Sequence, residues 1–104
     1  MVEAMDSRQT PETGTIVRME QGRDTGQFAI VIQVIDERFV LVADGDKRKY
    51  DRPKRKNVHH LSPVSFSPEV RRSLEESGRV TNAKLRFAIA AFLNEQDELT
   101  KEGE

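Results

Sequence analysis

The sequence predicts a small, mainly β domain, in which an antiparallel barrel is followed by two short α-helices. Three observations support this fold class. Short runs of β-branched and other apolar residues, separated by turns that contain glycine or aspartate, fill residues 15–61. Beyond residue 67 the apolar residues recur at helical spacing instead. The chain has 104 residues, of which 36% are hydrophobic, so it has room for one modest core.

Five short strands are expected before the helices. Their predicted ranges are 15–20, 28–35, 38–43, 47–50 and 57–61. Asp44-Gly45 favours a type I′ hairpin between the third and fourth strands, because both central positions of that turn need positive φ. Pro53 ends the fourth strand, since proline has no N–H group to donate to a sheet. Closing the strands into a barrel would remove the sheet edges that otherwise promote aggregation.

The first helix is expected after a connector over residues 61–68, which Pro63 interrupts. Ser67 is a good N-cap, and Pro68 suits the first position of a helix. Gly78 ends this helix, because glycine readily adopts the left-handed conformation of a C-terminal cap.

The second helix is expected to begin at Thr81 or Asn82 and to run to about Gln96. Its apolar residues form one face, made of Leu85, Ala88, Ile89 and Phe92 and widened by Phe87 and Ala91. A helix of this length is marginal in isolation, so it is expected to dock. We expect it to pack over one end or an open edge of the barrel. The alternative is that helix 82–96 binds a protein partner or a second copy of the chain.

Composition and charge divide the chain into four segments. They are a flexible acidic tail over 1–13, the barrel over 14–61, a helical extension over 62–98 and a frayed tail over 99–104. Residues 14–60 carry ten Lys or Arg against seven Asp or Glu, whereas residues 61–104 carry six against eight. The net charge of −1 therefore conceals a basic middle flanked by acidic ends.

Several cellular locations and redox sites are disfavoured. The chain has no cysteine, which excludes disulfides, thiolate metal sites and a cysteine nucleophile. Its first residues are acidic where a signal peptide needs a basic patch and an apolar stretch. The longest apolar run, Phe87 to Leu93, is too short to span a bilayer. We therefore expect a cytoplasmic protein without a membrane segment.

No catalytic or metal-binding arrangement is expected either. His59 and His60 are adjacent, and on a strand they would point to opposite faces, which disfavours chelation of one ion. A nucleophilic serine would need a histidine base and an orienting group, and the sequence singles out no such set. We expect a protein that is not an enzyme and holds no cofactor.

A dense basic run is the strongest candidate binding site. Its seven cations are Lys47, Arg48, Lys49, Arg52, Lys54, Arg55 and Lys56. Only Asp51 opposes them within the run. Cations placed near phosphates release condensed counterions, which gives affinity for nucleic acid without sequence information. Tyr50 could stack on a base. The alternative is a solvated charged loop without a partner.

The loop from Gly22 to Gly26 is a second candidate. Its two glycines allow positive φ and a close approach of the backbone to a ligand, so its N–H groups could meet a phosphate or a ribose. The alternative is a tight connection between two strands. The loop is not a phosphate-binding P-loop, because the Gly-Lys-Ser/Thr ending is missing.

The stretch GTIVRMEQGRDTGQFAIVIQV resembles a KOW motif, in which a glycine opens a strand and Gly-Arg-Asp-x-Gly leads into a β-branched strand. The continuation resembles small bacterial KOW-domain RNA-binding proteins, which are related to a large-subunit ribosomal protein of archaea and eukaryotes. Their Pro-Lys-x-Lys-Asn-x-x-His-Leu ending is carried here by Pro53, Lys54, Lys56, Asn57, His60 and Leu61. The resemblance covers residues 14–61.

This resemblance implies an SH3-like (KOW) barrel that binds RNA, often ribosomal RNA. The motif loop would be formed by Gly22, Arg23, Asp24 and Gly26. The basic residues of 47–56 would lie on the RNA side together with His60. Core ribosomal proteins are usually strongly basic throughout, whereas this chain is acidic at both ends. An accessory, ribosome-associated protein of translation therefore fits better. A protein-interaction module and a transcription-associated KOW domain that binds DNA are the alternatives.

Overall fold

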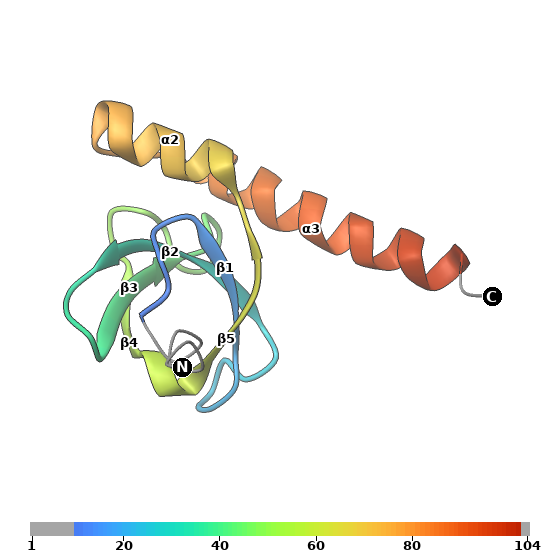
Figure 1. The fold of residues 1–104 in the computed structure, drawn as a ribbon, viewed down its shortest axis with the longest axis horizontal. Helices are drawn as coiled ribbons and strands as arrows, with labels where there is room; N and C mark the ends of the chain where they lie inside the picture. Colours follow the sequence, from blue (N-terminus) through green and yellow to red (C-terminus); the bar gives the residue numbers. More distant parts are fainter. Residues whose placement is uncertain (1–9, 103–104) are drawn as a thin grey trace, which may run out of the picture.

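A curved antiparallel sheet and two C-terminal helices make up the computed structural model, which describes residues 10–102 and the side chains of residues 10–96 (Figure 1). The strands are β1 (Thr15–Met19), β2 (Phe28–Val34), β3 (Phe39–Ala43), β4 (Lys54–Asn57) and β5 (Leu61–Phe66). The helices are the 3₁₀ turn η1 (Val58–His60), α2 (Pro68–Ser77) and α3 (Asn82–Glu102). The predicted class, mainly β with two C-terminal helices, is confirmed.

The sheet carries an apolar cluster on each of its two sides, because successive strand residues point to opposite faces. The inner cluster is formed by Val17, Met19, Ala29, Val31, Val40, Val42 and Leu61. The outer cluster joins the sheet to the helices and is formed by Ile16, Ile30, Ile32, Ala43, Val70, Val80, Leu85, Ala88 and Phe92. The one modest core expected from composition is thus divided into two clusters, one of which joins the sheet to the helices.

The predicted closure of the barrel is wrong. The strand order is β4-β3-β2-β1-β5, and within residues 10–102 no pairing joins the two outer strands, β4 and β5. The turn η1 lies directly between them in sequence, so the chain cannot continue as one extended strand. The edges have other protection, since β4 is rich in cations and β5 contains Pro63.

The predicted strand over 47–50 is also wrong, because these residues belong to a loop over 44–53. The Asp44 carboxylate accepts backbone N–H groups of Asp46 and Arg48, at 2.8 and 2.9 Å, and closes the loop on itself. Within this loop only Gly45 has positive φ, at 80°, so the turn is not type I′. Pro53 precedes a strand instead of ending one, since β4 starts at the next residue.

Residues 57–61, predicted as one strand, are instead the end of β4, the turn η1 and the first residue of β5, and the predicted connector over 61–68 is largely β5. The Asn57 side chain accepts the backbone N–H of His59 and caps the 3₁₀ turn. Pro63 is accommodated because β5 is an edge strand, paired only with β1. His59 and His60 therefore lie on a turn, and the argument that they point to opposite faces of a strand does not apply.

The predicted starts of both helices are confirmed. Ser67 accepts the N–H of Val70, and Gly78 ends α2 with φ of 79°. The hydroxyl of Thr81 accepts the N–H of Lys84, so Thr81 is the cap of α3. This helix runs to Glu102, past the predicted end and into the segment that was predicted to fray.

Helix α3 docks on the outer side of the sheet rather than over an end or an edge of it. Leu85, Ala88 and Phe92 are buried there, and the Phe28 ring meets the Phe92 ring edge-on at 5.4 Å. Phe87, which was predicted to widen the packed face, is instead 66% exposed. The helix continues beyond the sheet toward the C-terminus (Figure 1).

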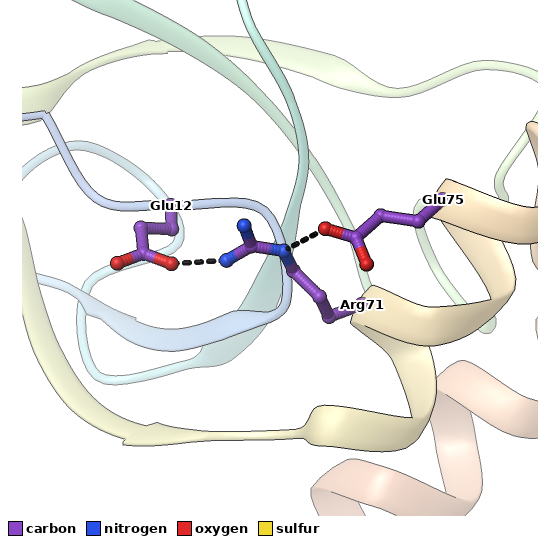
Figure 2. Close-up of polar contacts among 3 residues, drawn as sticks. All are labelled: Glu12, Arg71 and Glu75. Carbon is purple, nitrogen blue, oxygen red and sulfur yellow. Dashed lines mark hydrogen bonds and ion pairs between the residues drawn. The ribbon is translucent and has the colours of Figure 1, made fainter.

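An ion-pair cluster connects the segment before β1 to α2 (Figure 2). The Arg71 guanidinium donates through Nη1 to Glu12 and through Nε to Glu75, the latter at 2.7 Å. These hydrogen bonds, to Glu75 and then to Glu12, raise the pKa of Arg71 above its ordinary value. Arg71 is thus a charged group that already has two carboxylate partners.

Replacing Gly45 by alanine is expected to lower the free energy of unfolding by about 2 to 3 kcal/mol. Gly45 has positive φ, which disfavours alanine. In addition, the Cβ atom of alanine would overlap the backbone oxygen of Asn82. Gly78→Ala is the matched control, because Gly78 has nearly the same φ but open space around it, so about 1 kcal/mol is expected there. Urea denaturation measures both. Equal losses would contradict the close approach of the loop to α3.

Candidate nucleic-acid interface

The basic run is divided between a loop and a strand. Lys47, Arg48, Lys49 and Arg52 are exposed in loop 44–53. Lys54, Arg55 and Lys56 make up most of β4, at one edge of the sheet. The strand forms because its backbone pairs with β3, with Lys54 opposite Val42 and Lys56 opposite Val40.

The loop from Gly22 to Gly26 lies beside β4. The Lys54 ammonium is 3.5 Å from a carboxylate oxygen of Asp24. The Lys56 ammonium lies close to Gly22, at 3.7 Å from the position that a Cβ atom would take there. The loop is shaped by positive φ at both glycines and by the Thr25 hydroxyl, which donates to the Gly22 carbonyl at 2.6 Å. The structure therefore brings together two features that are about thirty residues apart in the sequence.

A small cavity of about 50 Å³ marks the place where the two loops meet. Its lining residues are Met19, Asp24, Gln27, Ala29, Val42, Asp44, Lys47, Arg48 and Lys54. Its floor belongs to the inner cluster, and its rim combines three cations with two carboxylates. The volume suits a water molecule or an ion rather than a nucleotide, so larger partners would contact only the rim.

Arg55 is separated from the lysines on either side of it. Its guanidinium lies 4.3 Å from the centre of the Phe39 ring, a cation–π contact. Side chains alternate along a strand, so Arg55 and its two neighbours point to opposite faces of the sheet. The seven cations predicted as one surface are thus not all on the same face.

Two further predicted residues have structural contacts. The Tyr50 hydroxyl donates to the Gly78 carbonyl at 3.2 Å, and its ring packs against the outer cluster. The His60 carbonyl accepts the N–H of Glu20 at 2.9 Å, which fixes η1 beside the end of β1. Stacking of Tyr50 on a base and contact of His60 with RNA stay predictions.

Sequence reasoning missed two residues that support the basic loop from α3. The Asn82 side chain accepts the Tyr50 N–H at 2.7 Å, and Arg86 donates to the Gly45 carbonyl at 2.7 Å. No local signal could have found them, because they lie 32 and 41 residues from their partners.

The four loop cations are available to an external ligand. Within residues 10–96, no hydrogen bond or ion pair engages the side chains of Lys47, Arg48, Lys49 or Arg52. In the same part of the chain no three His, Asp or Glu side chains gather as a metal site would require. No helix that the structure describes is long and apolar enough to cross a membrane. The four exposed cations of loop 44–53 support electrostatic binding of an anion.

Comparison with known proteins places the chain in a family. It is 30% identical over 87 residues to "Large ribosomal subunit protein eL14" of Saccharolobus islandicus, across 75% of this chain and 91% of the relative. The chain belongs to the eL14 family. The eL14 protein of Pyrobaculum neutrophilum is 27% identical over 85 residues, across 82% of both chains. A Bacillus subtilis protein named "Putative ribosome-binding protein YbzG" is 46% identical over 54 residues, across 51% of this chain and 73% of the relative.

Membership of the eL14 family bears out the predicted relationship to large-subunit ribosomal proteins. No protein-family model matches the chain. The KOW motif therefore stays a prediction from the residues of the Gly22–Gly26 loop and its flanking strands. The two eL14 alignments cover 82% and 75% of the chain, which is more than residues 1–61 make up. The similarity therefore extends into the helical part. Sequence reasoning had matched no family feature there.

Proposed function

We propose that this protein is a non-enzymatic, RNA-binding accessory protein of the ribosome, acting in the cytoplasm. It contacts RNA phosphates through loop 44–53, β4 and the KOW-like loop Gly22–Gly26. The observation that carries the proposal is the meeting of these segments at Asp24 and Lys54, beside four cations whose side chains have no partner within residues 10–96. The names of the relatives support the ribosome as the target, since they include a large-subunit protein and a ribosome-binding protein.

The two loops have different tasks in this proposal. The exposed cations of loop 44–53 meet phosphates and release counterions. The glycine loop lets the RNA backbone approach closely, because Gly22 and Gly26 carry no side chain. The Asp24 carboxylate holds the Lys54 ammonium between the loops, so that this cation is positioned before RNA arrives.

The salt dependence of RNA binding tests the electrostatic part of the proposal. Six phosphate contacts would give a slope of about −4 to −5 in a plot of log affinity against log salt concentration. Fluorescence anisotropy with a ribosomal RNA fragment at several salt concentrations measures this slope. DNA of matched sequence is the control, and tighter binding to DNA would favour the transcription-associated alternative. A slope near zero would contradict phosphate contacts.

Association with the ribosome is tested by sedimentation of cell extracts in a sucrose gradient, with and without RNase. We expect the protein to travel with large ribosomal subunits and to move to the top of the gradient after RNase treatment. A protein that stays at the top in both gradients would contradict the proposal.

One observation favours a second, protein-binding surface. A groove of about 340 Å³ lies between β5 and α3, and it exposes Phe87 (66%) and Phe66 (44%). Glu69 and Glu95 line it, and no cation does so among the described residues. These features fit a basic segment of a neighbouring protein that inserts an apolar side chain.

Phe87→Ser is expected to abolish any protein complex that survives nuclease treatment, while RNA affinity stays unchanged. The exposed ring is the largest apolar contact that the groove offers, and its loss does not disturb the core. Co-purification of tagged protein after RNase treatment, followed by mass spectrometry, measures this. Recovery of the same complex with the variant would exclude the groove as the docking site.

A further inference from the structure

A second groove lies on the other flank of α3, next to the basic loop. We call it the α3 groove. Its lining residues are Gln27, Phe28, Asp44, Asp46, Lys47, Arg86, Ile89, Ala90 and Leu93, and its volume is about 400 Å³. This volume lies within the range of small-ligand pockets, whereas the 50 Å³ cavity between the loops is far too small for one.

The walls of the α3 groove are apolar and held in place. Phe28 packs edge-on against Phe92, so its ring has a fixed orientation. Arg86 donates to the Gly45 carbonyl at 2.7 Å and so ties the loop side of the groove to the helix side. Leu93 is 44% exposed, which leaves apolar surface for a flat ligand.

The charges at the rim indicate where an anion would sit. Lys47 lines both this groove and the small cavity, so the groove is continuous with the proposed RNA surface. Arg86 adds a second cation from the helix side. Asp44 and Asp46 also line the groove and repel a phosphate, so the negative charge is favoured only beside Lys47 and Arg86.

We propose that the α3 groove receives the base of one unpaired nucleotide, whose phosphate lies beside Lys47. This inference rests on the proposed RNA-binding function and adds a base-contacting site to a surface that otherwise meets only phosphates. A base has two flat apolar faces, which fit between the loop and the flank of α3 formed by Ile89 and Leu93. Proteins that bind single-stranded RNA commonly hold bases on apolar or aromatic side chains next to a cationic groove.

The test compares Leu93→Ser with Phe87→Ser, since both remove an exposed apolar side chain from α3 but on opposite flanks. Binding of a short single-stranded RNA is measured by fluorescence anisotropy at several salt concentrations. We expect Leu93→Ser to weaken binding by about tenfold and to leave the salt slope unchanged, because apolar contact with the base is lost while phosphate contacts remain. Phe87→Ser should bind as the wild type does.

The outcomes separate this inference from the proposed function. If the wild type binds RNA and the two variants bind it equally well, the α3 groove is not a base site, while the proposed function stands. If the wild type binds a ribosomal RNA fragment but not the single-stranded RNA, this inference fails and the proposed function stands. If the wild type binds neither RNA, the proposed function fails and this inference fails with it. If Leu93→Ser weakens RNA binding and Phe87→Ser does not, the result supports both this inference and the proposed function. Circular dichroism of each variant checks that the fold is intact.

Discussion

Charge reversal of Lys47, Arg48 and Lys49 to glutamate is expected to lower RNA affinity by at least about a hundredfold at physiological salt. Each of these exposed side chains would lose a phosphate contact, and each new carboxylate would repel the RNA backbone. The salt slope should become less negative by about 2 to 3, because each lost phosphate contact removes about one counterion. Anisotropy with a ribosomal RNA fragment gives both quantities. Thermal stability should change little, since these side chains are exposed.

A matched control separates local contacts from net charge. Arg38, Arg72 and Arg79 are also exposed, and they lie outside the proposed interface. Reversing these three to glutamate changes the net charge of the protein by the same amount. We expect this control to bind RNA within a few-fold of the wild type. If both triple variants lose affinity equally, the attraction is a property of total charge and the proposed surface is wrong.

Leu85→Ala is expected to lower the free energy of unfolding by about 3 to 4 kcal/mol. The Leu85 side chain is completely buried, in the outer cluster that joins α3 to the sheet. Its truncation removes buried apolar surface and leaves a cavity that packed neighbours fill only in part. Urea denaturation followed by circular dichroism measures the loss.

Leu93→Ala is the control for this stability prediction, because Leu93 is on the same helix but 44% exposed. We expect a loss of about 1 kcal/mol or less there. Equal losses for the two variants would mean that α3 does not dock through Leu85. Separate transitions of helix and sheet in the wild type would likewise contradict a cluster shared between them.

Features that depend on neighbouring residues were predictable from the sequence. The cap at Ser67, the proline after it and the stop at Gly78 act within one helix, so the bounds of α2 followed from residue type alone. The long β-branched run of β2 was likewise sufficient to place that strand.

Features that depend on distant partners were not predictable. Strand β4 consists of Lys54–Asn57, which has no apolar alternation, and it is a strand only because β3 lies beside it. The region predicted as a strand before Pro53 is instead a loop. There the Asp44 side chain takes up backbone N–H groups that a strand would have paired.

The candidate site shows the same division. The basic run and the glycine loop were both singled out by composition, and the structure places Lys54 beside Asp24 as their point of contact. The sequence could not indicate that Arg55 turns away to cover Phe39. Nor could it indicate that the Tyr50 ring packs against the core.

The attachment of loop 44–53 to the rest of the protein has a consequence for selectivity. Asp44 ties the loop to itself, while Asn82 and Arg86 fasten its backbone to α3. A loop already held in one shape loses little conformational entropy when a partner arrives. Its backbone also holds the points from which the cations project at nearly constant separations. Such a surface should distinguish a folded RNA, whose phosphates have a matching spacing, from a flexible polyanion of equal charge density such as heparin.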